Sequence, residues 1–180
     1  MGASFTKDYP QRYIAENRQY VSYDQTLKVG PYNFGFANTR PDWVEHYPYQ
    51  NGLLIWLWDS SQKDNNVSTH PGHGLILPID AHAKPLKWAD GKVIRNKIQP
   101  FDAPFSWYPT DGFTLHNGDV ATKIKPQFGV PVFDDHKGTY WYEENKTGSV
   151  QVTDTNTRIS IINEPFSGST VTVHVGPSHK

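Results

Sequence analysis

Residues Gly52–His82 read GLLIWLWDSSQKDNNVSTHPGHGLILPIDAH, and this stretch decides the fold. It contains two apolar runs, Leu53–Trp58 and Leu75–Ile79, and an aspartate follows each run directly. Short apolar runs that end at turn residues are typical of buried strands. A helix is the rival interpretation of Leu53–Trp58, but Gly52 and the polar segment DSSQKDNN leave too few residues for one. We therefore predict two core strands joined by a polar loop.

The rest of the chain has the composition of an all-β protein. Six Trp, ten Tyr and nine Phe are spread between turns rich in Gly and Pro, which number fourteen each. Aromatic and β-branched residues favour strands, and no long stretch has helical periodicity. Further strands are predicted at residues 12–23, 92–98, 113–115, 138–142, 149–153, 157–162 and 170–175, the last of them forming a meander. We expect an antiparallel β-sandwich, jelly-roll-like and with long loops.

No linker divides the chain. A length of 180 residues suits one domain. We assign residues 11–176 to a single β-sandwich domain, residues 1–10 to a disordered or artificially added N-terminus, and residues 177–180 to a tail.

Charge and composition exclude several classes of function. The net charge of −1 argues against an electrostatic grip on nucleic acid. No apolar run approaches the ~20 residues of a membrane span. The chain has no cysteine and no Gly-x-Ser-x-Gly motif, so a hydrolase interpretation lacks a nucleophile.

Polar residues of the Gly52–His82 stretch form the best candidate site. The set consists of Asp59, Asp64, Asn65, His70, Asp80 and His82. Carboxylate and amide oxygens suit calcium, and the histidines with aspartates would suit zinc instead. We expect a structural metal ion, calcium ahead of zinc. The alternative is a hydrogen-bonded loop with no ligand, since acidic residues are common at turns.

Other acidic residues are weaker candidates as metal ligands. Asp102, Asp119, Asp134 and Asp135 are alternative oxygen donors. At strand ends they are better explained as turn caps.

Aromatic residues support a second hypothesis, a carbohydrate-binding module of a secreted enzyme. Trp107 and Tyr108 lie beside prolines in the segment FDAPFSWYP and could present an exposed platform for a sugar ring. Trp56 and Trp58 share one face of a strand. We expect both of these to be core residues, because their strand is apolar on both faces.

Several segments resemble the C-terminal region of the immune inhibitor A family of secreted bacterial metallopeptidases, peptidase family M6. They are RYIAENR, NGLLIWLWD, the DNN…HPGHGLILPIDAH run, the FDAPFSW run and GVPVFDD, in the family's order over residues 11–175. Two positions depart from the pattern. His73 replaces the glutamate of the family's His-Pro-Gly-Glu-Gly motif, and Ala83 replaces a proline. With His73 at this position, the chain lacks that carboxylate.

The resemblance implies a secreted parent protein that is a zinc metalloendopeptidase. It does not imply that this chain cleaves peptides. None of the eight histidines is followed by glutamate, so the HExxH signature of the catalytic zinc is missing. The implied role is that of a non-catalytic C-terminal domain. Its partners would be the upstream protease domain of the same polypeptide and a protein or polysaccharide substrate.

Overall fold

The computed structural model describes residues 10–24, 49–94, 99–117 and 120–178. All regular elements in these ranges are strands and short 3-10 helices. The strands are β1 (Gln11–Arg18), β2 (Gly52–Asp59), β3 (Ile76–Ile79), β4 (Phe113–Asn117), β5 (Val120–Ile124), β6 (Val132–Asp134), β7 (Arg158–Asn163) and β8 (Thr172–Gly176). The 3-10 helices are η1 (Ser22–Asp24), η3 (Gln99–Asp102), η4 (Gly138–Tyr140) and η5 (Glu143–Asn145).

The two predicted core strands are confirmed and pair with each other. β1, β2 and β3 form one antiparallel sheet in that order. In the β2–β3 register Ile55 lies opposite Ile79 and Leu57 opposite Leu77. The long polar loop between β2 and β3 thus begins and ends on neighbouring strands, which fixes its two ends.

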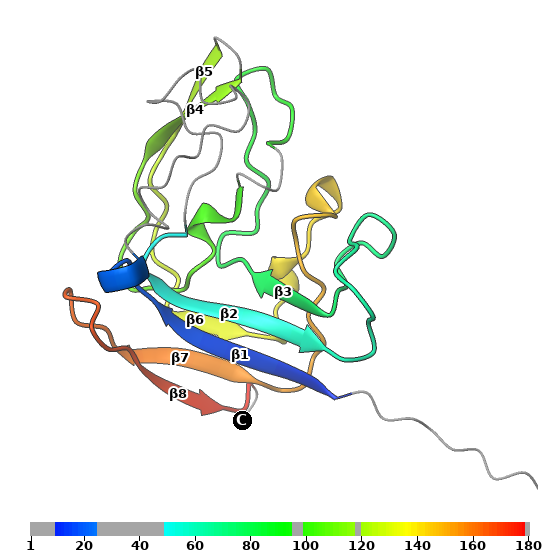
Figure 1. Ribbon diagram of the computed structural model, residues 1–180, viewed down its shortest axis with the longest axis vertical. Helices are drawn as coiled ribbons and strands as arrows, with labels where there is room; N and C mark the ends of the chain where they lie inside the picture. Colours follow the sequence, from blue (N-terminus) through cyan, green and yellow to red (C-terminus); the bar gives the residue numbers. More distant parts are fainter. Residues whose placement is uncertain (1–9, 25–48, 95–98, 118–119, 179–180) are drawn as a thin grey trace, which may run out of the picture.

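A second sheet, β6-β7-β8, packs against the first (Figure 1). Its strands are consecutive and antiparallel, and the last two strands of the predicted meander are confirmed as the pair β7–β8. The inward faces of both sheets contribute to one core, which includes Ile55, Phe105, Phe133 and Ile159. Phe105 and Phe133 are fully buried, and burial of a side chain this size is worth about 1.5–3 kcal/mol. The antiparallel β-sandwich is therefore confirmed; the jelly-roll topology stays a prediction.

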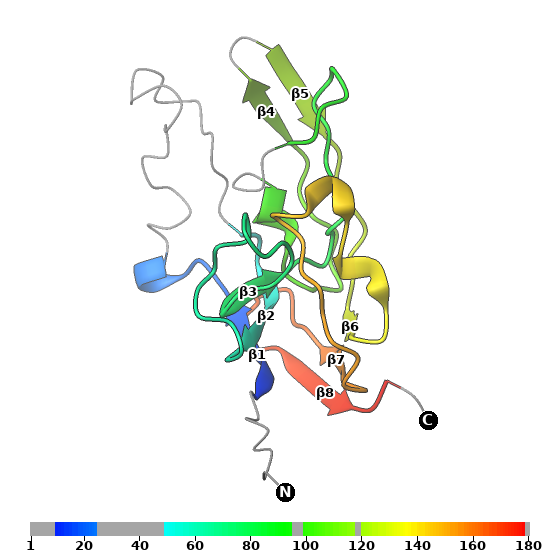
Figure 2. The ribbon, with the colours of Figure 1, turned by 90° about the vertical axis from the view of Figure 1, so that its right-hand side faces the viewer.

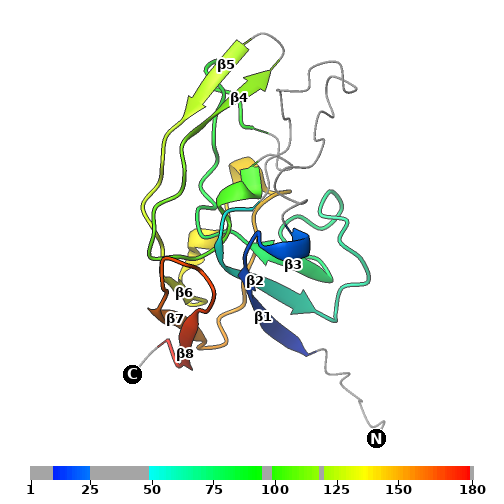
Figure 3. The ribbon, with the colours of Figure 1, turned by 60° about the vertical axis from the view of Figure 1, so that its left-hand side comes forward.

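The hairpin β4–β5 extends away from the sandwich (Figures 1 and 2). A second, smaller cluster lies at its base, made of Ile94, Phe101, Leu115 and Ile124. Figure 3 shows the hairpin at one end of the molecule and the two sheets at the other. The segments that precede and follow the hairpin, including η3, lie between the hairpin and the two sheets.

Four strand predictions differ from the structure. The strand predicted at residues 12–23 ends at Arg18 as β1, and residues 22–24 form the 3-10 helix η1. Residues 138–142 were expected to form a strand, but residues 138–140 are the 3-10 helix η4, because the buried Tyr140 ring packs on Phe133 from a tight turn. Residues 149–153 form no ladder; Val150 and Gln151 instead donate single backbone hydrogen bonds to Tyr140 and Gly72. The predicted strand at residues 92–98 keeps only an isolated bridge at Val93, and residues 95–98 lie outside the described ranges.

The expectation that Trp56 and Trp58 are core residues is also wrong. Trp56 is only half-buried and Trp58 is 38% exposed. The core face of β2 carries Leu53, Ile55 and Leu57, so both tryptophans lie on the opposite face. There Trp58 contacts the guanidinium of Arg12, which lies 5.5 Å from the ring centre.

No helix in the described part of the chain is long and apolar enough to cross a bilayer.

Candidate functional site

Asp80, His82 and Asp102 form a compact cluster beside the core. Each offers a ligand atom, and these atoms lie within 4.8 Å of one another. Asp80 directly follows β3, and Asp102 ends η3. The two segments run side by side, since the backbone N–H of Ala81 donates to the carbonyl of Ala103 at 2.9 Å. Backbone pairing therefore brings together two acidic residues that are far apart in the sequence.

Hydrogen bonds orient each side chain of the cluster. Asp80 forms a turn in which its Oδ1 accepts from the backbone N–H of His82 at 2.7 Å. The ring nitrogens of His82 lie 2.7 Å from the Asp102 carbonyl oxygen and 2.9 Å from that of Phe128. Asp102 Oδ2 accepts from the side-chain amide of Gln127 at 2.6 Å. The cluster is thus held by partners from three separate segments.

The two carboxyl groups lie in a poorly solvated environment. Asp80 is 4% exposed and Asp102 is fully buried. Burial raises the pKa of Asp80 to about 6. Burial, and after it the neighbouring Asp80 charge, raises the pKa of Asp102 well above its usual value. Desolvation and mutual repulsion both disfavour two bare carboxylates at this place.

The structure brings only two of the six predicted site residues into this cluster. Asp80 and His82 belong to it, and Asp102 joins them. Asp59 instead caps a turn, accepting from the Ser61 N–H at 2.9 Å and the Gln11 amide at 2.8 Å. Among the described residues Asp59 belongs to no group of three metal-ligating side chains.

Asp64, Asn65 and His70 hold the loop together by internal hydrogen bonds. Asp64 Oδ1 lies 2.9 Å from His70 Nε2 and accepts from the Asn66 N–H at 2.7 Å. The other ring nitrogen of His70 lies 2.6 Å from the carbonyl oxygen of His73. Asn65 Oδ1 accepts from the Ile76 N–H at 2.8 Å. Asp64, Asn65 and His70 therefore have the kind of hydrogen-bond partners that the alternative of a hydrogen-bonded loop predicts.

The remaining acidic candidates behave as turn caps. Asp134 accepts from the N–H of His136 at 3.2 Å. Asp135 accepts from the N–H groups of Thr155 and Thr157 at 3.0 and 2.8 Å. Asp119 lies outside the described residues.

A pattern in the sequence marks Asp102 as a partner of Asp80. Asp102 lies in Phe101-Asp102-Ala103, which repeats the pattern of Ile79-Asp80-Ala81. In both places an aspartate is held between a buried apolar residue and an alanine. The repeated pattern marks the two segments that the structure places side by side.

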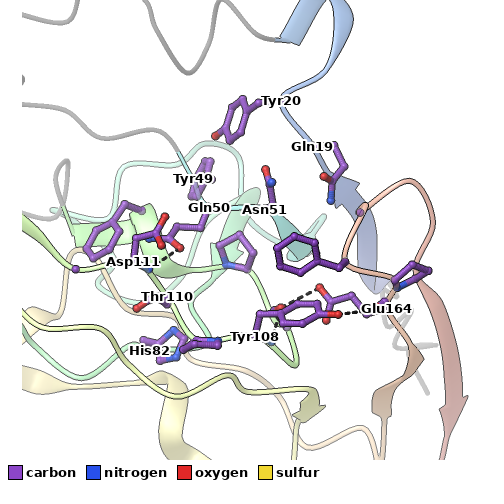
Figure 4. Close-up of a pocket in the computed structure, with 18 residues that line it drawn as sticks. Gln19, Tyr20, Tyr49, Gln50, Asn51, His82, Tyr108, Thr110, Asp111 and Glu164 are labelled. Carbon is purple, nitrogen blue, oxygen red and sulfur yellow. Dashed lines mark hydrogen bonds between the residues drawn. The ribbon is translucent and has the colours of Figure 1, made fainter.

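An aromatic groove of about 620 Å³ lies next to the cluster, and His82 forms part of its wall. The rings of Tyr49, Tyr108 and Phe166 line it (Figure 4). Tyr108 and Phe166 meet edge to face, with 5.7 Å between ring centres. Tyr108 is 39% exposed and Trp107 is 46% exposed, but of this predicted pair only Tyr108 lines the groove.

Glu164 fixes the aromatic wall of the groove, a role that sequence reasoning missed. Its buried carboxylate accepts from the Ser106 hydroxyl at 2.9 Å and the Trp107 N–H at 2.7 Å. Its backbone carbonyl accepts from the Tyr108 hydroxyl at 3.0 Å. Glu164, the residue that follows β7, therefore positions the two consecutive aromatic residues Trp107 and Tyr108.

Comparison with known proteins identifies the class to which this fold belongs. A family profile described as "Immune inhibitor A-like metallopeptidase, VEG domain" matches residues 6–173. The chain therefore belongs to the VEG domain family of immune inhibitor A-like metallopeptidases, and the resemblance found in its motifs is confirmed.

Two relatives show how the domain relates to longer proteins. Immune inhibitor A of Bacillus thuringiensis subsp. alesti is 27% identical over 149 residues, which cover 81% of this chain and 18% of that protein. Pre-pro-metalloprotease PrtV of Vibrio cholerae serotype O1 (strain M66-2) is 39% identical over 75 residues, or 41% of this chain and 8% of that protein. The chain thus spans less than a fifth of either relative.

Proposed function

We propose that this chain is a non-catalytic accessory domain of a secreted immune inhibitor A-like zinc metallopeptidase. It packs against the upstream protease domain of the same polypeptide and stabilises that domain outside the cell. The observation that carries the proposal is the family match over residues 6–173. The small share of the relatives' length that the chain covers leaves ample polypeptide to serve as the partner.

The outer face of the first sheet supports a docking role. In the β1–β2 register Ile14 lies opposite Trp56, and in the β2–β3 register Trp58 lies opposite Ile76. These residues point away from the core, and Ile14, Trp58 and Ile76 are 39%, 38% and 38% exposed. The solvent face of an antiparallel sheet is ordinarily polar. A contiguous apolar strip on this face is the kind of surface that packs against another domain.

A binding experiment tests the docking role. The 180-residue chain is titrated into the separately produced protease domain of its parent, and the affinity is measured by calorimetry. Ile14→Thr and Ile76→Thr, which keep β-branching but remove apolar surface, should each weaken binding about 5- to 30-fold, or about 1–2 kcal/mol. Ile162→Thr on β7 is the matched control, because Ile162 is 56% exposed on the other sheet. Equal affinity for all of these variants and the wild type would contradict the proposal.

The aromatic groove favours carbohydrate binding as a second candidate function. Its rings lie beside polar side chains such as Gln50, Asn51 and Asp111, and this mixture suits a sugar with one apolar face and several hydroxyls. Tryptophan fluorescence and NMR shifts are followed while cell-wall and plant polysaccharides are added. Shifts at Tyr108 that Phe166→Ala abolishes would support this candidate. An unresponsive Tyr108 across the panel would exclude it.

A further inference from the structure

We propose that Asp80, His82 and Asp102 bind one divalent metal ion. The proposal stands on the geometry of this cluster and does not depend on whether the domain docks on a protease. Two of the three residues belong to the predicted site, whereas the complete set follows only from the structure.

The first observation is the convergence of three donor atoms. Ligands of one ion at about 2.0–2.6 Å from it cannot be more than about 5 Å apart. The donor atoms of the cluster satisfy this limit, since they lie within 4.8 Å of one another. Two of the donors are carboxylates and the third is an imidazole, which are ordinary protein ligands of divalent metals.

The second observation is a buried carboxylate oxygen without a partner. Asp102 is fully buried, and its Oδ1 accepts no hydrogen bond. A buried acceptor left unsatisfied is destabilising, so native structures rarely contain one without a reason. Within the described ranges, the other such atoms are Glu16 Oε1 and Arg18 Nε, which face each other at 3.8 Å. Asp102 Oδ1 is thus the atom that a metal ion would satisfy.

The surroundings of the donors have the form of a ligand-orienting shell. Gln127 donates to Asp102 Oδ2 and leaves Oδ1 available. The His82 N–H donates to Asp80 Oδ1. One ring nitrogen of His82 can donate to a backbone carbonyl and so fix the ring, as is usual for metal-bound histidine, and a bound ion would replace the carbonyl contact of the other ring nitrogen.

The charge of the cluster also fits a divalent metal ion. Two carboxylates and a neutral imidazole carry a charge of −2, which one divalent ion neutralises. The competing arrangement is an imidazolium between the carboxylates, since both His82 ring nitrogens lie near carbonyl oxygens and both can donate only in the protonated ring. Protonation of Asp102 would balance the charge of that arrangement, but the arrangement still leaves Asp102 Oδ1 without a hydrogen-bond partner, and a divalent ion accounts for that atom.

Zinc and calcium differ in how they would use these residues. Zinc accepts a nitrogen donor and needs few ligands, so it would use His82 with both aspartates. Calcium requires six to eight oxygens and would use the carboxylates with carbonyls and water. With either ion the site would tie together the end of β3, the end of η3 and the segment at Gln127, and so would stabilise the fold.

The test uses the untagged 180-residue chain, stripped with EDTA and reloaded separately with zinc and with calcium. Elemental analysis should find one ion per chain after dialysis. At a hundredfold excess of ion over Kd the melting temperature should rise by roughly 5–10 °C. His82→Gln should abolish the rise for zinc and preserve it for calcium, which distinguishes the two ions.

Asp102→Asn should abolish the rise for both ions. Its matched control is Asp135→Asn, another buried carboxylate but one with hydrogen-bond partners for both oxygens. That control should lower the starting melting temperature and keep the metal-induced rise. The proposal is overturned if the wild type binds neither ion, or if Asp102→Asn binds as well as the wild type. Should Asp102→Asn fail to fold, the wild-type stoichiometry and the His82→Gln result decide.

Discussion

The hydroxyl of Tyr13 on β1 donates a hydrogen bond of 3.2 Å to Oδ2 of Asp135, the residue after β6. The bond joins the two sheets of the sandwich at one edge of the core. The Tyr13 ring also packs on Phe133, with 4.8 Å between ring centres. One side chain therefore contributes both apolar packing and a polar cross-link between the layers.

Replacing Tyr13 by phenylalanine separates these two contributions. Tyr13→Phe keeps the ring and removes the hydroxyl, while Asp135 keeps its bonds from Thr155 and Thr157. We expect a loss of about 1 kcal/mol in the free energy of unfolding, measured by urea denaturation. Tyr13→Ala should cost about 3–5 kcal/mol because it also leaves a cavity. Equal losses in the two variants would show that the ring does not pack in the core.

The same tyrosine predicts a loss of stability in alkali. Burial, and after it the Asp135 charge, raises the pKa of Tyr13 above the ordinary value of about 10. The folded chain then keeps a proton that the unfolded chain releases, so this contribution is complete below about pH 10 and falls as the pH rises further. Urea midpoints measured between about pH 9 and pH 11.5 should fall less steeply in Tyr13→Phe. An identical slope in the variant would contradict the assignment.

Gly72, in the His-Pro-Gly-His-Gly segment, has no room for a side chain. Its φ is +80°, and an added Cβ would lie 2.5 Å from the Trp141 ring. We expect Gly72→Ala to cost roughly 2–4 kcal/mol, from strain and overpacking together. At Gly91 φ is +87° but the space is open, so Gly91→Ala should cost only about 1–2 kcal/mol.

Gly138→Ala is the control for this series, because nothing lies within 4 Å and φ is not in the left-handed region. It should be neutral or slightly stabilising. Thermal melts of the three variants rank them directly. A neutral Gly72→Ala would mean that the loop does not pack on Trp141.

The stability of the chain should depend on the carboxylate of Glu164. In Glu164→Gln one carboxylate oxygen becomes an amide that faces either the Ser106 hydroxyl or the Trp107 N–H. Replacing one acceptor of this buried pair should cost about 1–3 kcal/mol and alter the fluorescence of Trp107. Glu143→Gln, at a side chain that is 80% exposed, should change stability by less than about 0.5 kcal/mol. A Trp107 spectrum unchanged in Glu164→Gln would argue against the role of Glu164.

The sequence was most informative where burial alone determines structure. The apolar runs at β2 and β3 bury Leu53, Ile55, Leu57 and Ile79 in the core, so their strands were predictable even though Trp58 and Ile76 are exposed on the other face. The hairpin strand Val120–Ile124 (VATKI) was missed because its apolar residues do not follow its burial: Thr122 is buried and Val120 is exposed. Its pairing with β4 supplies the support that its own sequence lacks. Residues 138–142 show the opposite error, since their aromatic residues favour a strand while packing of Tyr140 in the core requires a turn.

In the candidate site, the residues that are neighbours in the sequence were predictable, whereas the residue added by a tertiary contact was not. The Asp80-x-His82 spacing is local, so the pair could be found from the sequence. The contribution of Asp102 depends on the pairing of Ala81 with Ala103, which is a tertiary contact. The loop residues Asp64 and His70 lie outside the cluster of Asp80, His82 and Asp102 and pair with each other within the loop.

The small cluster under the β4–β5 hairpin gives the molecule two cooperative units of unequal strength. Among the described residues, four buried side chains support the hairpin end, whereas ten support the sandwich. Amide groups of the hairpin should therefore exchange with deuterated solvent through local opening, while those of β2 exchange only when the whole sandwich unfolds. Evolution can consequently remodel the hairpin end without risking the half of the molecule that holds the two layers together.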